Sequence, residues 1–461
     1  MNNQKKKPGP RIPPVFVTAM RGGDAVTRLS LLILGLGSLI HKQIGRFVVF
    51  IAIEIGYISY MAVTGVKSLQ NMTTLGAVEQ AEVYNETLGI YEYSTGDNSM
   101  LFLLYGVVTI IITLVFACFM MGSVRCAYSA QKLRETGKKQ PSFARDIQSM
   151  FDANLYKMFL TWPIIGVLIF TIVPLIFMIL IAFTSFDRNH QPPGNLFGWV
   201  GFANFKEMLS SNGSMSGTFW PVLGWTVIWA IFATFTNYVL GMLLAIIINR
   251  NGTQIKSFWR FVFVLSIALP SFVSLLTMRT IFADNGAFNI LLRSIGLIGQ
   301  SDTVSYFGNP LLAKFMVVII NIWIGVPFTM LTTTGILKNI PAELYEAANV
   351  DGAGPVYTFF RITIPYMIFV TTPYLITTFV GNINNFNVIY LLTGGGPDTL
   401  DYYHAGKTDL LVTWLYKLTI QHKDYNLGSV ISIMVFVLMA TTSLIAYRYT
   451  GAYKNEEEFQ K

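Results

Sequence analysis

Long apolar runs separated by polar stretches dominate the chain, and eight of them have the length of a membrane-crossing helix. A helix needs about 20 apolar residues to cross roughly 30 Å of hydrocarbon. A shorter, glycine-rich apolar stretch from Leu29 to Ile40 predicts an interfacial helix instead. The pattern predicts an all-α integral membrane protein with eight transmembrane helices, at residues 45–65, 101–123, 158–183, 219–248, 259–283, 311–335, 367–392 and 427–448.

The composition favours the same class. Hydrophobic residues make up 53% of the 461 residues and charged residues only 12%, whereas soluble domains carry about 25% charged residues. The net charge of +8 in a membrane protein more often marks cytoplasmic loops than nucleic-acid binding, so we expect contact with lipid and none with nucleic acid. Two cysteines in or beside one apolar run and four scattered histidines predict no disulfide framework and no metal site.

The charged loops orient the chain. With a cytoplasmic N-terminus, 23 of the 32 Lys and Arg residues fall in cytoplasmic segments or at the adjoining ends of the spans. Five acidic residues instead lie together in the first outer loop, namely Glu79, Glu82, Glu86, Glu92 and Asp97. Because positive loops stay inside, we expect both termini in the cytoplasm of a multi-pass cell-membrane protein.

The sequence carries no motif of a membrane enzyme. Gly406-Lys407-Thr408 matches part of a phosphate-binding loop, but Asp401 stands where that motif needs its first glycine. No nucleophile elbow and no zinc-protease motif is present. We therefore expect no catalytic residue, no metal and no cofactor in this chain, so that another subunit must bind any ATP that is used.

The loop between the sixth and seventh candidate spans predicts a short helix with defined ends. Pro341 suits a first helical turn, and Gly352 suits the left-handed residue just past a helix end. Glu343 and Glu346 remain free to meet an external cation. A small apolar stripe at helical spacing accompanies them, made of Leu344, Ala347 and Ala348.

The complete spacing of this loop resembles the EAA loop of binding-protein-dependent ABC importers. Glu346-Ala347-Ala348 is followed after three residues by Gly352, and nine residues later the segment Ile362–Pro365 begins. The family pattern ends in Ile-x-Leu-Pro, so Ile364 is a mild departure. Other segments look like the larger permease subunit of maltose-type importers, namely Asn321–Phe328, Asp351–Pro355, Leu392–Asp398 and Thr408–Leu411.

The resemblance covers residues 150–450 well, and residues 1–150 are closer to the counterparts in Gram-positive malto-oligosaccharide importers. Proteobacterial members carry a large folded insert between spans 3 and 4 that is lacking here. The resemblance implies an ABC importer type I permease fold. Its parts would be a cytoplasmic arm with an interfacial helix at 1–44, a family-specific hairpin and loop at 45–157, a core six-helix domain at 158–448 with the EAA loop at 340–365, and a cytoplasmic tail at 449–461.

The same resemblance implies partners and a coupling site. The partners would be a second permease subunit, two ATP-binding-cassette ATPases that bind ATP and Mg, and an extracellular solute-binding protein. In the family the loop helix sits in a cleft of the ATPase, where its glutamate pairs with a basic residue. By this match Glu346 is the coupling residue, Ala347 and Ala348 belong to the docking helix, and Gly352 is its turn.

Polar residues at membrane depth indicate a substrate site. On a helical wheel, a stripe of span 7 falls within an arc of roughly 100°, made of Thr378, Gly381, Asn382 and Asn385, while Asn384 and Asn387 point elsewhere. Span 6 offers a complementary stripe, made of Asn321, Ile324, Gly325 and Phe328. All of these except Asn321 match the family's sugar site, although the family has an aromatic residue at the position of Gly381. The alternative is that the asparagines only bond helix to helix, which we favour for Asn384 and Asn387.

These features predict a permease subunit for oligosaccharides, with maltose and malto-oligosaccharides as the first expectation. Another glycan, such as a galacto-oligosaccharide, is the alternative substrate. An ion-coupled secondary sugar transporter is the rival class, and Glu54, the one carboxylate predicted at mid-membrane, would then be a relay acid. No second buried acid or histidine accompanies Glu54, so we expect it to have a structural partner.

Overall fold

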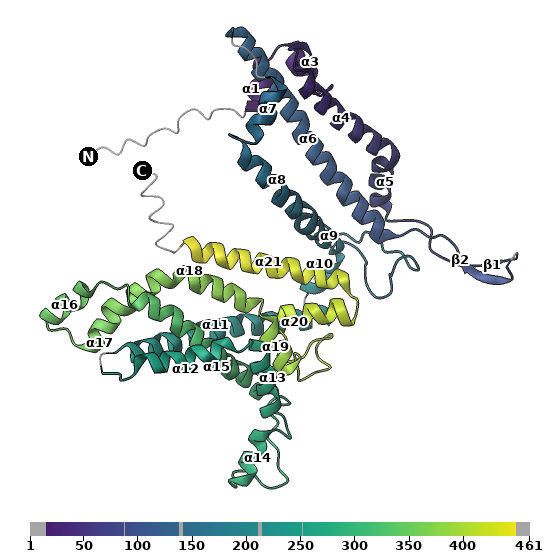
Figure 1. The fold of residues 1–461 in the computed structure, drawn as a ribbon. Coiled ribbons are helices and arrows are strands. Elements are labelled where there is room, and N and C mark those ends of the chain that lie inside the picture. Colours follow the sequence, from purple (N-terminus) through teal and green to yellow (C-terminus); the bar gives the residue numbers. More distant parts are fainter. Residues whose placement is uncertain (1–14, 87, 138–141, 211–213, 251, 449–461) are drawn as a thin grey trace. The chain divides into compact units, whose positions relative to one another are not determined.

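The computed structural model describes residues 15–86, 88–137, 142–210, 214–250 and 252–448, and most of them are helical (Figure 1). Seven described helices are long and apolar enough to cross a membrane, and a bent pair of helices makes an eighth crossing if it counts as one span. The predicted all-α membrane class is therefore confirmed. Two compact units divide the chain, Met1–Val200 and Gly201–Lys461.

The first unit holds three spans, flanking short helices and a β-hairpin. Its spans are α4 (Ile44–Tyr60) continued by η1 (Met61–Gly65) and α5 (Val66–Thr74), then α6 (Ser99–Glu135), then α8 (Leu155–Val167) continued by η2 (Leu168–Ile172) and α9 (Val173–Ile181). Its short elements are α1 (Val15–Gly22), α2 (Ala25–Leu29), α3 (Leu36–Ile40), α7 (Phe143–Met150), β1 (Glu82–Asn85) and β2 (Ile90–Tyr93).

The apolar stretch from Leu29 to Ile40 is not one continuous helix, as we expected, because α-helix is found only at Leu29 and over its last five residues, which form α3. Helix α2 ends at Leu29 and α3 begins only at Leu36, because Gly35 turns the chain with a φ of 80°. The carboxylate of Glu54 accepts a hydrogen bond from the backbone N–H of Leu34 at 2.8 Å and holds this turn. Glu54 thus has the structural partner that the sequence predicted.

The second unit contains the remaining spans and the helices between them. Its longest helices are α11 (Ser214–Asn249), α15 (Pro310–Leu337), α18 (Ile364–Ile383) and α21 (Tyr425–Arg448). The shorter ones are α10 (Ala203–Leu209), α12 (Lys256–Ala268), α13 (Ser271–Ile281), α14 (Ala287–Ser294), α16 (Ala342–Val350), α17 (Pro355–Thr358), η3 (Phe359–Thr363), α19 (Phe386–Thr393), α20 (Leu411–Tyr416) and η4 (Lys417–Gln421).

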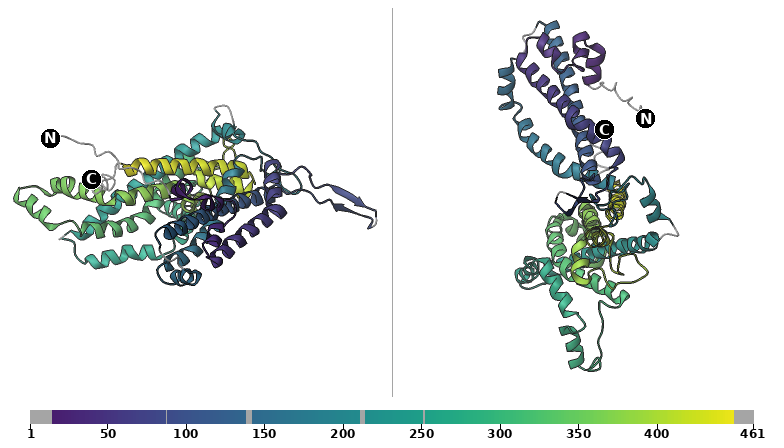
Figure 2. Two further views of the ribbon diagram at one scale, coloured as in Figure 1. Left: turned by 90° about the horizontal axis from the view of Figure 1, so that it is seen from above. Right: turned by 90° about the vertical axis from the view of Figure 1, so that its right-hand side faces the viewer.

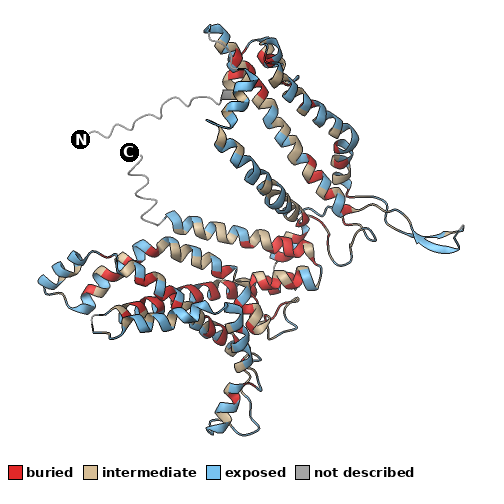
Figure 3. Ribbon diagram, viewed as in Figure 1, coloured by how far each residue is buried: buried red, intermediate tan, exposed pale blue. Residues whose placement is uncertain are grey.

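Helices α11 and α15 form the centre of this unit, and its buried side chains gather along them (Figure 3). Small residues allow the two backbones to approach closely, as is usual between membrane helices. A Cβ atom added at Gly241 on α11 would lie 2.6 Å from the Cβ of Thr329 on α15. Earlier on α11, Trp225 and Trp229 belong to a buried core cluster that also contains Met316, Val317 and Ile320 of α15.

Two predicted spans are interrupted. The fifth is bent by 88° between α12 and α13, because Pro270 lacks a backbone N–H and disfavours helical geometry at Leu269. The seventh ends at Ile383, whereas we expected it to continue to residue 392, and a separate helix α19 follows. Asparagine side chains compete for backbone hydrogen bonds, so the run of asparagines ends the helix instead of continuing it.

The helices that follow the two interruptions, α13 and α19, pack against each other. Helix α16 is at one end of its long helices, and α19 and α20 are at the other end (Figures 1 and 2). The predicted sidedness of these ends stays a prediction, as do the four predicted parts of the chain. Residues 1–14 of the predicted arm and the whole predicted tail at 449–461 lie outside the described residues.

Candidate coupling helix and candidate substrate site

The predicted docking helix is present as α16, with the predicted ends. Pro341 is its N-cap residue, and Gly352 follows its end with a φ of 76°. Two hydrogen bonds close the end, from the N–H of Ala353 to the oxygen of Ala348 at 2.9 Å and from the N–H of Gly352 to the oxygen of Asn349 at 3.1 Å. This pattern is a Schellman motif, which satisfies the last carbonyls and needs a left-handed residue where glycine stands.

One face of α16 is open. Glu346 and Ala347 are exposed and Ala348 is half-buried. Glu343 and Glu346 take part in none of the ion pairs found among the described residues. Beside them is a hollow of about 590 Å³, lined by Leu344, Ala347, Ala348, Asp351, Gly352, Ala353, Gly354, Tyr357 and Ile362. The apolar stripe predicted from the sequence therefore faces this hollow.

The opposite face of α16 is anchored by Tyr345, which the sequence analysis missed. Its hydroxyl lies 3.0 Å from the hydroxyl of Thr363, at the start of the span that continues as α18. Its ring packs against a buried cluster that joins α11 and α18, with Tyr238 and Met367 among its members. Tyr345 thus connects α16 to two transmembrane helices. An aromatic residue between two exposed glutamates was the available signal.

The predicted substrate residues on α15 take three different environments. Ile324 packs against the central core, and Phe328 is exposed. Gly325 is a contact position, since a Cβ atom added there would lie 2.1 Å from Nδ2 of Asn237 on α11. On α18, Thr378 is half-buried and Gly381 is exposed, and no atom of the described residues lies within 4 Å of a Cβ added at Gly381.

The two predicted asparagines come together, although they do not share a helix. Asn382 lies in the last turn of α18, and Asn385 is the N-cap residue of α19. The Nδ2 group of Asn385 donates to Oδ1 of Asn382 at 3.3 Å, and Nδ2 of Asn382 donates to the hydroxyl of Thr234 at 3.0 Å. The helical-wheel argument was therefore wrong for Asn385, yet the predicted proximity holds. Asn384 and Asn387 are exposed.

Helix α11 contributes the polar partners that the sequence analysis missed. Thr234 bonds Asn382, and Trp229 donates its indole N–H to the backbone oxygen of Asn382 at 3.1 Å. Nearby, Oδ1 of Asn237 and Nδ2 of Asn321 are buried, and neither has a hydrogen-bond partner among the described residues. A buried polar atom without a partner carries a desolvation penalty of about 1–3 kcal/mol. Threonine and asparagine at three-residue spacing inside span 4 were the sequence signal.

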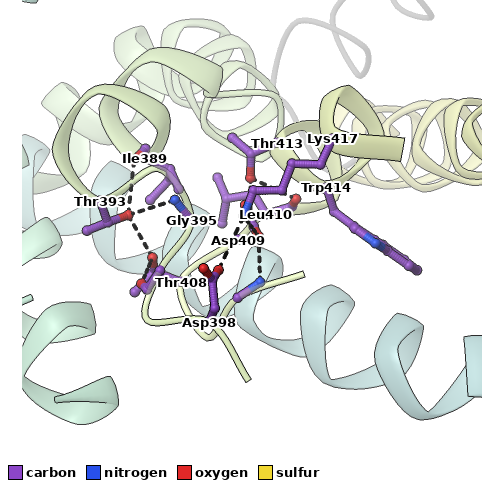
Figure 4. Close-up of polar contacts among 12 residues, drawn as sticks. Ile389, Thr393, Gly395, Asp398, Thr408, Asp409, Leu410, Thr413, Trp414 and Lys417 are labelled. Carbon is purple, nitrogen blue, oxygen red and sulfur yellow. Dashed lines mark hydrogen bonds and ion pairs between the residues drawn. The ribbon is translucent and has the colours of Figure 1, made fainter. Parts of the chain in front are cut away.

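The segments Leu392–Asp398 and Thr408–Leu411, which the sequence singled out, lie together in one network of hydrogen bonds (Figure 4). The hydroxyls of Thr393 and Thr408 lie 2.7 Å apart. The Oδ2 atom of Asp409 accepts hydrogen bonds from the backbone N–H of Gly406 and from Nζ of Lys417, both at 2.7 Å. Burial raises the pKa of Asp409, and the charge of Lys417 opposes this rise. Gly395 is required here, because a Cβ on it would overlap Asp409.

Comparisons with known proteins agree with this architecture. The family model "Binding-protein-dependent transport system inner membrane component" matches residues 237–453. The chain is 31% identical over 430 residues to the maltodextrin transport system permease protein MdxF of Bacillus subtilis (strain 168), covering 92% of this chain and 95% of that protein. It is 34% identical over 434 residues to the galactooligosaccharides transport system permease protein GanP of the same organism, covering 94% and 99%.

Solved structures agree on the fold. A chain of the crystal structure of a bacterial alginate ABC transporter, in complex with an alginate pentasaccharide-bound periplasmic protein, has a TM-score of 0.53 and 23% identity, covering 66% of this chain and 95% of that chain. The near full-length matches to the Bacillus permeases confirm that the resemblance extends into the first 150 residues. The chain therefore belongs to the binding-protein-dependent transport system inner membrane components, as a multi-pass permease subunit of an ABC importer.

Proposed function

We propose that this permease moves an uncharged oligosaccharide, with maltodextrins as the first candidate substrate. The observation that carries the proposal is the uncharged polar cluster around Asn382 and Asn385, deep among the membrane helices. Amides and hydroxyls suit the hydroxyl groups of a neutral sugar, and polar groups at membrane depth mark substrate pathways. Oδ1 of Asn237 and Nδ2 of Asn321 have no partner among the described residues, and a sugar that reached these buried atoms would satisfy one acceptor and one donor group.

The names of the relatives support the same substrate class and leave two candidates. MdxF is named for maltodextrin and GanP for galactooligosaccharides, and their identities to this chain are 31% and 34%. Sequence identities of 31% and 34% are too similar to favour one glycan over the other as the substrate. Galacto-oligosaccharides are therefore the second candidate, to be separated from maltodextrins by measurement.

Uptake into proteoliposomes that hold the complete importer tests the site. With maltotriose and galactotriose as separate substrates, the wild-type complex should accumulate one of them when ATP is supplied. Asn382→Leu and Asn385→Leu should each lower the rate at least tenfold, because each removes sugar-binding groups and leaves others unpaired. Asn384→Leu and Asn387→Leu are matched controls, since both residues are exposed.

A second control separates sugar binding from helix packing. Thr234→Val removes the side-chain bond from Asn382 to α11, while the amide of Asn382 and the bond from Trp229 to its backbone oxygen remain. If Asn382 only joins helices, Thr234→Val should reproduce the uptake defect of Asn382→Leu. If the amide binds sugar, Thr234→Val should keep most of the uptake. Unchanged affinity in both asparagine variants would place the substrate elsewhere.

We further propose that two partner ATPases hold α16 and supply ATP and Mg, so that this chain is not itself an enzyme. The exposed Glu346, the adjacent hollow and the anchoring of Tyr345 on the transmembrane helices support this role. A second permease subunit would complete the translocation path, and an extracellular solute-binding protein would deliver the sugar. Closure of the ATPases would then reorient the helices by alternating access.

Charge reversal at the two glutamates of α16 tests the coupling role. Glu346→Lys should abolish uptake and uncouple ATP hydrolysis, whereas Glu343→Lys makes the same charge change one turn earlier and should retain most activity. An importer with Glu346→Lys that transports normally would contradict the docking role. Uptake by the purified chain alone, driven by an ion gradient, would instead favour the secondary-transporter class.

A further inference from the structure

The β-hairpin of the first unit presents tyrosine rings on one of its faces. Strands β1 and β2 pair antiparallel, with Glu82 opposite Tyr93 and Tyr84 opposite Tyr91. Because directly opposite residues share a face, these four side chains lie together. The rings of Tyr84 and Tyr91 meet edge to face at 5.2 Å, and the hydroxyl of Tyr93 donates to Glu82 at 2.8 Å.

Both faces of this hairpin are uncovered. Tyr91 is 70% exposed on one face and Ile90 is 53% exposed on the other, and the turn exposes Leu88 at 62%. A two-stranded hairpin is marginally stable in water when nothing packs on it. The exposed rings and aliphatic side chains therefore need a partner surface, since the hairpin extends away from the helices of its own unit (Figure 2).

The base of the hairpin is held in place by hydrogen bonds. The carboxylate of Asp97 accepts the backbone N–H groups of Ala77 and Val78 at 2.8 and 3.1 Å, which lowers the pKa of Asp97. The hydroxyl of Ser94 accepts the N–H of Ala81 at 2.9 Å. A surface fixed in this way loses little conformational entropy when it binds. The base of the hairpin is thus preorganised, and a partner that packs on the two strands would stabilise the rest.

The charge of this segment selects the kind of partner. Residues 68–124 contain no Lys, Arg or His, and their five acidic residues all lie between positions 79 and 97. Such a surface repels anionic lipid headgroups and nucleic acid, and it would also repel a second copy of itself. Lys and Arg side chains fit it, because they pair with carboxylates and stack on tyrosine rings. The complementary surface is therefore a cationic patch on a protein.

We propose that the β1–β2 hairpin is a docking arm for a Lys- and Arg-bearing surface of the extracellular solute-binding protein. The proposal rests on the proposed function, which supplies that partner, and on the predicted outer side of the loop between the first two spans. Tyr84, Tyr91 and Tyr93 provide the contact area, while Glu86 and Glu92 steer the approach. Electrostatic steering of this kind speeds association and weakens as salt screens it.

The test uses the complete importer in proteoliposomes, with its binding protein added in increasing concentration while ATP hydrolysis is followed. The double variant Tyr84→Ala with Tyr91→Ala should raise the half-maximal concentration of binding protein about tenfold. The double variant Glu86→Lys with Glu92→Lys should do the same at low salt and lose its effect at high salt. The maximal rate should remain, because neither pair belongs to the candidate substrate site or to α16.

Matched controls isolate the rings and the location of the charge. Tyr84→Phe with Tyr91→Phe keeps the rings and should behave like wild type. Glu207→Lys reverses an exposed acidic residue of α10, outside the hairpin, and should change the half-maximal concentration little. An unchanged half-maximal concentration in both hairpin variants, while wild-type hydrolysis responds to the binding protein, overturns the docking arm alone. A wild-type importer that ignores its binding protein overturns the proposed function together with the arm.

A photo-crosslinking residue in place of Tyr91 gives an independent readout. It detects the contact itself and does not require a variant that weakens binding. In the intact importer it should form a covalent product with the binding protein, and the yield should fall as salt is raised. A product formed only with lipid, or with a second permease chain, would overturn the proposal.

Discussion

Asp409 and Lys417 form a buried ion pair, with Oδ2 of the carboxylate 2.7 Å from Nζ of the lysine. The side chain of Asp409 is fully buried, and that of Lys417 is 10% exposed. The pair joins the loop after α19 to η4, because Lys417 belongs to η4. Asp409 also accepts the N–H of Gly406 within the loop. One carboxylate therefore fixes the connection between the last two long helices of the chain.

Removing one member of this pair should destabilise the protein strongly. Lys417→Met leaves the carboxylate of Asp409 buried without its cation, and breaking a buried pair in this way costs about 3–5 kcal/mol. Thermal unfolding of the detergent-solubilised protein measures the loss. The double variant Asp409→Leu with Lys417→Met removes both charges and should recover much of the stability. A double variant that is no better than Lys417→Met would contradict a direct pair.

Two glycines of the candidate substrate site should respond differently to the same substitution. Gly325→Ala places a methyl group against Asn237, where the added Cβ would lie 2.1 Å from Nδ2, and overpacking of this kind costs about 1–3 kcal/mol. Gly381→Ala adds its methyl group where no atom of the described residues lies within 4 Å. The unfolding temperature should fall for Gly325→Ala and stay near that of the wild type for Gly381→Ala. Equal unfolding temperatures would contradict the close approach of α11 and α15.

Tyr345 should govern how tightly ATP hydrolysis is linked to transport. Tyr345→Ala removes both the packing on the Tyr238 cluster and the bond to Thr363, so α16 could move without moving α18. The number of sugars imported per ATP should fall severalfold in reconstituted importer. Tyr345→Phe removes only the hydroxyl, worth about 0.5–1.5 kcal/mol, and should have a smaller effect. An unchanged ratio in Tyr345→Ala would show that force passes by another route.

Local patterns predicted α16 well and predicted the seventh span poorly. Pro341 and Gly352 fix the ends of α16 through backbone preferences that act within a few residues. The asparagine run from 382 to 387 was equally visible, but apolar neighbours suggested an uninterrupted helix. The break appears after Ile383, where Asn385 caps a new helix by accepting the N–H of Val388. The helix breaks there because asparagine side chains compete for backbone hydrogen bonds. Hydrophobic periodicity does not report this competition.

By itself the sequence determined the membrane class, the approximate positions of the spans, the short helix with Glu346 and the polar character of the region around Asn382. These features depend on hydrophobic length and on capping, which are local. Only the tertiary structure decided that Asn382 meets Thr234, 148 residues earlier, and that Tyr345 anchors α16 on Thr363. Such pairs depend on which faces of distant helices pack together, and the order of residues along one helix does not specify that packing.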